Sequence, residues 1–179
     1  KKLHRKIVYS YSLCAADYDS DGRLDLFVCA YDPDELLEEK NGQVAVSAGP
    51  FVYYDSNNGA ANSLFKNEIE GDRWEFQDVT KSSGLDVNNR RWSYAASWED
   101  FDNDGDQDLY VANDFGRNNL YRNDGSKFTD IAAQVDAEDS ASGMSAAWGD
   151  FDRDGFMDLH VGNMWSSAGR RIVPQEKFK

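Results

Sequence analysis

The sequence predicts an all-β fold made of four-stranded antiparallel propeller blades, two of them complete and a third in part. The first observation is a short acidic motif that occurs three times in the 179 residues. The second is that each copy lies between two short runs with the composition of β-strands. The third is a repeat unit of about 50 residues, a period typical of propeller blades.

The acidic motif has the frame D-x-D-x-D-G-x-x-D-L. Its nine-residue loops occupy residues 17–25, 100–108 and 150–158, and are called loops 1, 2 and 3. Carboxylates this close together repel one another unless a cation lies among them. Alternate aspartates can turn their side chains into one concave loop, and glycine at position 6 permits the positive φ of a tight turn. The motif therefore predicts three cation-binding loops.

Calcium fits this pattern best, because it takes several carboxylate and carbonyl oxygens in flexible geometry. Magnesium prefers octahedral sites that keep several waters. Zinc prefers histidine and cysteine, which the loops lack. The predicted ligands are the aspartates of positions 1, 3, 5 and 9 and the backbone carbonyl of position 7. In chain order they are Asp17, Asp19, Asp21, Arg23 (carbonyl) and Asp25; Asp100, Asp102, Asp104, Asp106 (carbonyl) and Asp108; and Asp150, Asp152, Asp154, Phe156 (carbonyl) and Asp158.

The EF-hand is excluded although its loop begins in the same way. An EF-hand needs a glutamate at position 12 and a helix on each side. Position 12 is valine in all three copies, as Val28, Val111 and Val161, and the flanks have strand composition. The similar dockerin loop is excluded for the same reason. Repeats of the thrombospondin calcium type need frequent cysteines, and this chain has two.

The strands are predicted in the order in which they follow the chain. Residues 9–13, 92–96 and 143–147 precede the three loops, and residues 26–28, 109–111 and 159–161 follow them. A third strand is predicted where residues 64–67 match 120–123, and a fourth where 76–79 match 128–131. The predicted units are blade 1 at about 7–87, blade 2 at about 92–137 and a partial blade 3 at about 142–179.

Blade 1 contains an insertion at residues 31–61. It accounts for most of the difference between the 83 residues that separate Asp17 from Asp100 and the 50 that separate Asp100 from Asp150. It contains the acidic run DPDELLEE and a predicted turn at Asn41-Gly42. Two interpretations stay open, a surface loop and a loop that binds a partner or ligand.

Composition narrows the classes of partner. The formal net charge of −14 argues against nucleic acid and anionic membrane surfaces as partners. No apolar run approaches the roughly 20 residues of a membrane-spanning helix, so membrane insertion is not expected. The chain begins without methionine or an export signal, which indicates a removed signal or a piece of a longer protein.

The sequence also predicts the roles of some residues outside the loops. Trp98 and Trp148 precede equivalent aspartates and are predicted to pack between blades. His160 is predicted to be an ordinary strand residue. Cys14 and Cys29 occupy small-residue strand positions beside loop 1, where they are either core residues or a cross-strand disulfide.

These motifs resemble the FG-GAP/VCBS repeat family, seen in the calcium-binding blades of integrin α-subunit propellers and in many secreted bacterial proteins. The resemblance rests on the loops at 100–109 and 150–159, on N-x-L-Y-R-N-D-G at 118–125 and on F-T-D at 128–130. A narrower resemblance, to the ASPIC/UnbV, cartilage-acidic-protein-like group, rests on residues 163–171 and 55–62. Propellers of the family close with about seven blades. The resemblance therefore implies that this chain is a fragment of such a propeller, and that the remaining blades of a longer chain are its partners.

The sequence thus predicts a non-enzymatic, calcium-stabilised module for adhesion or recognition of a protein or glycan. Extracellular modules bind calcium at about 10⁻⁴–10⁻³ M, so a secreted, periplasmic or cell-surface location is expected. The alternative is part of a calcium-dependent propeller enzyme, such as a polysaccharide lyase, with its catalytic residues outside this segment. The clustered arginines that could hold a uronate are Arg90, Arg91, Arg170 and Arg171.

Overall fold

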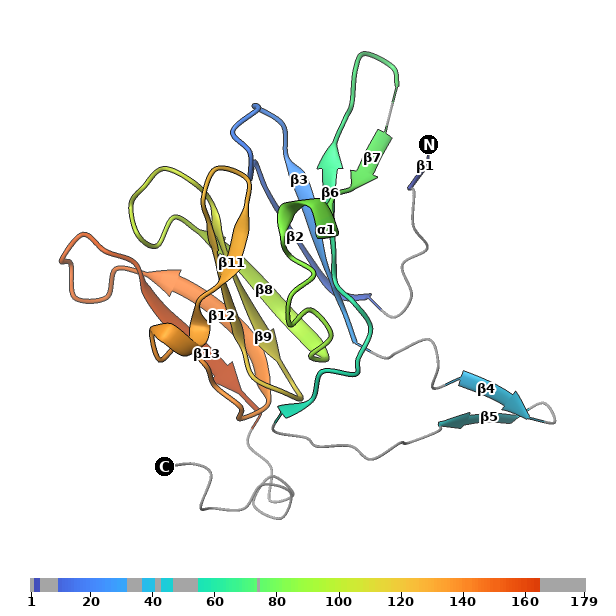
Figure 1. Ribbon diagram of the computed structural model, residues 1–179. Coiled ribbons are helices and arrows are strands. Elements are labelled where there is room, and N and C mark those ends of the chain that lie inside the picture. The colour runs from blue at the N-terminus through green and yellow to red at the C-terminus, as the bar shows by residue number, and fades with distance from the viewer. Residues whose placement is uncertain are drawn as a thin grey trace.

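In the computed structural model, the described residues form three β-sheets and a separate hairpin (Figure 1). It describes residues 10–31, 55–73 and 75–164 in full, and residues 2–3, 37–40 and 43–46 by their backbone. Predicted features at Asn41-Gly42, Arg170 and Arg171 lie outside the described residues.

The first two sheets share one topology. Sheet 1 runs β2 (Ser10–Ala16), β3 (Asp25–Ala30), β6 (Ser63–Asn67) and β7 (Glu75–Asp78), all antiparallel, and β1 (Lys2–Leu3) adds parallel to β7. Sheet 2 runs β8 (Ser93–Glu99), β9 (Asp108–Asn113), β10 (Asn119–Asn123) and β11 (Phe128–Asp130). Sheet 3 comprises the antiparallel pair β12 (Gly143–Gly149) and β13 (Asp158–Asn163).

The sheets follow one another like propeller blades. Strand β8 lies beside β2 on one side and beside β12 on the other, so the first strands of the three sheets are neighbours. Each sheet continues outward from its first strand in chain order, and the three acidic loops lie along one edge of the molecule (Figure 1). The predicted fold class, all-β with four-stranded antiparallel blades, is confirmed.

Burial along the strands reflects this arrangement. All six residues of β9 are buried, because sheets 1 and 3 cover both faces of sheet 2. In the first four residues of β13, by contrast, exposed and half-buried residues alternate with the period of two expected of a strand covered on one face. His160 lies on this strand, opposite Ala147, as predicted.

Aromatic side chains fill the spaces between the sheets. Trp98 meets Phe27 of sheet 1 edge-on, with ring centroids 6.3 Å apart. Trp148 meets Tyr110 of sheet 2 edge-on at 6.3 Å and stacks on Phe101 at 6.2 Å. The predicted inter-blade role of both tryptophans is confirmed, and each contact adds to the burial of apolar area.

Two short helical segments were not expected from the sequence. α1 (Thr80–Ser83) and the 3₁₀ turn η3 (Ala132–Gln134) follow the fourth strands of sheets 1 and 2. Asp78 accepts hydrogen bonds from the N–H and hydroxyl of Thr80, at 3.0 and 2.6 Å. Asp130 accepts from the N–H of Ala132 at 3.3 Å. This aspartate of the repeat therefore ends the strand by offering the next backbone N–H a local partner.

Among the described residues of the insertion, β4 (Leu37–Lys40) pairs with β5 (Gln43–Val46) as a hairpin. The segment that leads from the insertion back to β6, residues 55–62, is a packed part of the fold. Gly59 donates to the carbonyl of Arg90 at 2.7 Å, and Asn58 accepts from the indole N–H of Trp92 at 3.0 Å. A Cβ on Gly59 would lie 2.9 Å from the backbone nitrogen of Trp92, so only glycine fits there.

The cysteines do not face each other across the sheet. Cys14 pairs with Phe27 and Cys29 with Ser12, and both thiols are free. Burial raises the pKa of both thiols to about 12. Of the two interpretations left open by the sequence, the structure supports small core residues.

Matched phenylalanines test the inter-blade packing. Phe101 and Phe151 both occupy position 2 of a loop, but Phe101 stacks on Trp148 whereas Phe151 is 70% exposed. Phe101→Ala should lower the free energy of unfolding by about 2 kcal/mol, because it removes apolar contacts and leaves a gap. Phe151→Ala should change it by less than about 0.5 kcal/mol in this chain. Urea unfolding of both variants provides the measurement, and equal losses would contradict this packing.

Candidate metal centres

Each acidic loop gathers three carboxylates. One oxygen from each of positions 1, 3 and 9 lies within 4.8 Å of the other two. The groups are Asp17, Asp19 and Asp25; Asp100, Asp102 and Asp108; and Asp150, Asp152 and Asp158. Nine of the twelve aspartate side chains predicted as ligands therefore come together in three equivalent triads.

The position-1 aspartate shapes the loop. Asp17 accepts hydrogen bonds from the N–H groups of Asp21 and Gly22, at 3.0 and 2.8 Å. The glycine has φ 86°, in the region that an L side chain rarely adopts. Both features recur in the other loops, where Asp100 binds the N–H groups of Asp104 and Gly105, and Asp150 those of Asp154 and Gly155.

The position-9 aspartate begins the second strand of each sheet and closes the loop onto it. Asp108 accepts from the N–H of Phe101 at 3.2 Å and from the N–H of Asn123 on β10 at 2.7 Å. Asp25 makes the corresponding bonds to Tyr18 and Asn67, at 3.4 and 2.7 Å. Asp25 and Asp108 are both fully buried, because the third strand of their sheet covers them. Asp158 accepts from Phe151 at 3.0 Å and is exposed.

Burial makes these carboxylates hard to ionise in the metal-free protein. Desolvation raises the pKa of Asp108 to about 7, against the hydrogen bonds from Asn123 and Phe101, which lower it. Desolvation likewise raises the pKa of Asp25 to about 6. The pKa of Asp102 is also raised, first by desolvation and then by the charge of Asp104. A cation among these oxygens would favour their charged forms.

The position-5 aspartates lie outside the triads. Asp21 accepts from the N–H of Arg23 at 3.0 Å, Asp104 from Asp106 at 2.9 Å, and Asp154 from Phe156 at 2.8 Å. Each carboxylate thus makes a local turn with the residue two positions later. The predicted roles of the position-5 side chains and position-7 carbonyls as ligands stay predictions.

Asn123, at the end of the third strand of sheet 2, was missed by the sequence interpretation. Its amide donates to the carbonyl of Gln107 at 3.1 Å and to that of Tyr18, in loop 1, at 2.8 Å. It thereby connects loops 1 and 2. Asn67 is its counterpart in sheet 1, where it donates to Leu24 at 3.0 Å. The repeated asparagine in LFKN and LYRN was the available signal.

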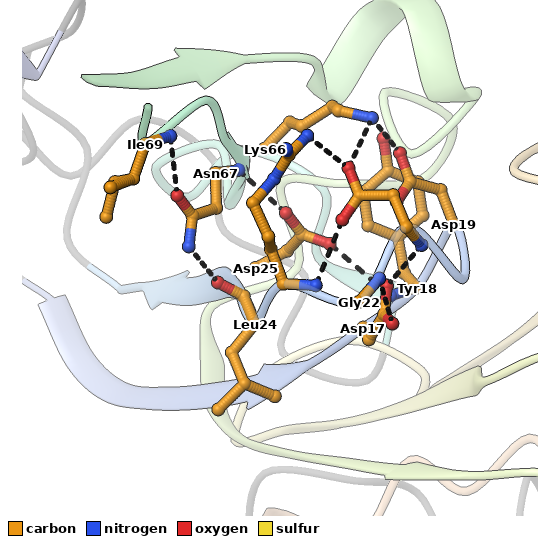
Figure 2. Close-up of polar contacts among 11 residues, drawn as sticks. Asp17, Tyr18, Asp19, Gly22, Leu24, Asp25, Lys66, Asn67 and Ile69 are labelled. Carbon is orange, nitrogen blue, oxygen red and sulfur yellow. Dashed lines mark hydrogen bonds and ion pairs between the residues drawn. The ribbon is translucent and has the colours of Figure 1, made fainter. Parts of the chain in front are cut away.

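Two basic side chains contact the carboxylates of loop 1, Lys66 from β6 (Figure 2) and Arg23 from the loop itself. The ammonium of Lys66 contacts a carboxylate oxygen of Asp19 and lies 3.1 Å from one of Asp21. Its pKa lies above the ordinary lysine value, chiefly because it donates to Asp19. The guanidinium of Arg23 contacts Asp21 at 2.5 Å. The other oxygen of Asp19 is buried without a hydrogen-bond partner.

Comparison with known families supports this account over part of the chain. Residues 100–161 match the model of the FG-GAP-like repeat. The matched stretch begins at loop 2 and includes loop 3 with strands β9 to β13, whereas loop 1 lies before it. The match does not bear on the narrower ASPIC/UnbV resemblance. A comparison with curated proteins gave no match to the chain.

The arginines considered for a uronate site are not gathered on one surface in the described residues. Arg91 is buried, and its guanidinium donates to the carbonyl of Arg117 at 3.2 Å, whereas Arg90 is exposed.

Among the residues that the structure describes, no helix is long and apolar enough to cross a bilayer.

Metal-free protein should lose stability as pH rises from about 4 to about 7. An unfolded aspartate titrates near pKa ~3.9, whereas the folded pKa of Asp108 is about 7. A group with a raised folded pKa contributes stability below its unfolded pKa and loses it as pH rises through the folded value. Urea unfolding in EDTA across this range measures the slope. Asp108→Asn should reduce the slope and leave the part that comes from Asp25, whose folded pKa is about 6. An unchanged slope in that variant would contradict the assignment.

Proposed function

We propose that this chain is a calcium-binding β-propeller module in which the ion is a structural staple. The observation that carries the proposal is the threefold recurrence of one carboxylate triad on one hydrogen-bonded loop frame. An acidic surface turn would not need the same three oxygens close together in each copy. The FG-GAP-like match over residues 100–161 supports the same function for loops 2 and 3.

The donor set fits a hard divalent cation. The triads contain only carboxylate oxygens, the donors that calcium prefers. In loop 1, the unpartnered buried oxygen of Asp19 is a further acceptor without a donor. The side chains that would hold calcium are those of positions 1, 3 and 9, with the position-5 carboxylate and position-7 carbonyl completing the shell.

A structural role follows from where the loops lie. Each loop joins the first and second strands of one sheet, and its position-9 aspartate is itself the first residue of the second strand. Calcium takes about six to eight oxygens, so five protein ligands would leave few positions for a substrate. Bound calcium would neutralise the buried carboxylate and fix the separation of the two strands. We therefore propose that the chain is not itself an enzyme.

Recognition or adhesion in a calcium-rich compartment is the wider role that we propose. Sites of this kind suit millimolar calcium, which favours a secreted, periplasmic or cell-surface protein. The net charge of −14 disfavours nucleic acid as the partner, and a protein or glycan ligand is proposed instead. The lyase alternative has less support, because Arg91 is buried and bonded to a carbonyl. Fractionation of the source cells tests the location, and a cytosolic product would contradict it.

Asp102→Asn separates metal binding from loop folding. Asp102 is a triad member and exposed, whereas Asp100 holds two backbone N–H groups and Asp108 is buried. Calcium that binds only the folded state adds about 2.7 kcal/mol at about 100 times Kd. EDTA should therefore lower Tm in the parent protein. Asp102→Asn should lower Tm in calcium but not in EDTA, where it removes a repelled charge.

Thermal unfolding with calcium and with EDTA supplies the comparison, and Asn103→Ser, at a neighbouring non-ligand position, is the matched control. Isothermal titration of calcium into the same proteins reports stoichiometry. A parent Tm that is identical in calcium and EDTA would remove the structural-staple proposal. Binding without a Tm change would mean that the ion is held but does not stabilise the fold.

A further inference from the structure

The third strands of sheets 1 and 2 place different basic residues beside otherwise equivalent loops. Lys66 in LFKN and Arg122 in LYRN occupy matched positions on β6 and β10, each just before the asparagine that bonds the position-9 aspartate. The two side chains form ion pairs with different partners. The ammonium of Lys66 reaches the carboxylates of loop 1, whereas the guanidinium of Arg122 turns to Asp124.

Lys66 lies among the predicted ligands themselves. It contacts Asp19, a member of the triad, and lies 3.1 Å from Asp21 at position 5 (Figure 2). Lysine is a compact point charge on a flexible stem, so it can approach two carboxylates at once. The guanidinium of Arg23 adds a second positive group at Asp21. Loop 1 is thus partly neutralised by the chain's own cations.

Among the described residues, no cation contacts a carboxylate of loop 2, and the charge of Arg122 acts on Asp102 and Asp108 only from a distance. Arg122 forms a two-point ion pair with Asp124, with Nε 3.1 Å and Nη2 3.0 Å from its two carboxylate oxygens. Loop 2 itself contains five aspartates and no basic residue, whereas loop 1 contains four aspartates and Arg23. Loop 3 contains four aspartates and Arg153. Loop 2 therefore has the strongest negative field, and loop 1 the weakest.

We propose that Lys66 is a built-in counter-cation of loop 1, which calcium must displace, so that loop 1 is the weakest of the three calcium sites. This inference rests on the proposed calcium binding and adds an order of filling to it. An ammonium and Ca²⁺ at the same carboxylates repel each other, and calcium affinity follows the net charge of the ligands. Loop 2 fills first, and loop 1 fills after the Asp19–Lys66 contact breaks.

The same contact gives loop 1 a metal-free state that loop 2 lacks. With Lys66 in place, the carboxylates of Asp19 and Asp21 face a positive charge even without an ion. In loop 2, by contrast, the guanidinium on the third strand pairs with Asp124 rather than with a loop carboxylate. Sheet 1 should accordingly depend less on calcium than sheet 2.

The first experiment isolates loop 1 in the full chain. Asp102→Asn and Asp152→Asn together disable loops 2 and 3, and isothermal titration with calcium then reports loop 1. Adding Lys66→Gln to this background should tighten binding by about tenfold or more, as expected when one neighbouring positive charge is removed. Arg122→Gln, the matched control, should leave the loop 1 affinity within about twofold, because Arg122 is paired with Asp124.

The second experiment uses the parent chain and thermal unfolding. Lys66→Gln should lower Tm in EDTA, where it removes the only cation that bridges Asp19 and Asp21 within the described residues. It should raise Tm in subsaturating calcium, where it removes the competitor. Arg122→Gln should not show this reversal of sign.

The outcomes separate the two proposals. If loops 2 and 3 bind calcium while Lys66→Gln changes neither the loop 1 affinity nor the sign of the Tm shift, the counter-cation inference is wrong and the proposed function stands. If no loop binds calcium at millimolar concentration, both the proposed function and the counter-cation inference are wrong. Tighter binding in the Lys66→Gln variant together with the reversed Tm shift supports the inference.

Discussion

The burial of one carboxylate at the start of the second strands of sheets 1 and 2 is the constraint on which the rest of the structure depends. Asp25 and Asp108 are fully buried at the ends of loops whose other aspartates are at least partly exposed. A buried charge is costly unless it is paired and hydrogen-bonded. Two backbone N–H groups reach each of these carboxylates, one from its own loop and one from the third strand. The loop, the first two strands and the third strand are therefore held at a single point.

The sheets depend on one another through the residues beside that point. In all three loops, position 2 donates its N–H to the position-9 aspartate. In loops 1 and 2, its ring also packs on the following sheet, as Tyr18 does with Phe128 and Phe101 with Trp148. Asn123 adds a polar bond to the carbonyl of Tyr18. Loop geometry and inter-sheet packing are consequently coupled, because a shift of position 9 would move the aromatic ring of position 2. Calcium bound at the loop would stiffen both contacts together.

Much of the fold and of the loops could be predicted from patterns within short segments of the sequence. The loops, their glycines with positive φ and the strands beside them depend on residues within one short segment, and the inter-sheet position of Trp148 followed from the repeat. What the sequence could not supply depends on tertiary contacts. The packing of residues 55–62 on Trp92, the bond from Asn123 to Tyr18 and the approach of Lys66 to Asp19 join segments 34 to 105 residues apart. No spacing rule within a motif encodes such contacts.

Position 5 shows why an identical motif does not fix an identical electrostatic state. Its carboxylate makes the same local turn in all three loops, so backbone geometry does not distinguish them. The difference comes from the third strand, which presents Lys66 to loop 1 and an arginine already paired with Asp124 to loop 2. A basic residue on that strand adds or withholds one positive charge without altering the loop itself. If the loops bind calcium as proposed, repetition sets where the ion lies, and the neighbouring strand sets how strongly the protein's own cations compete with it.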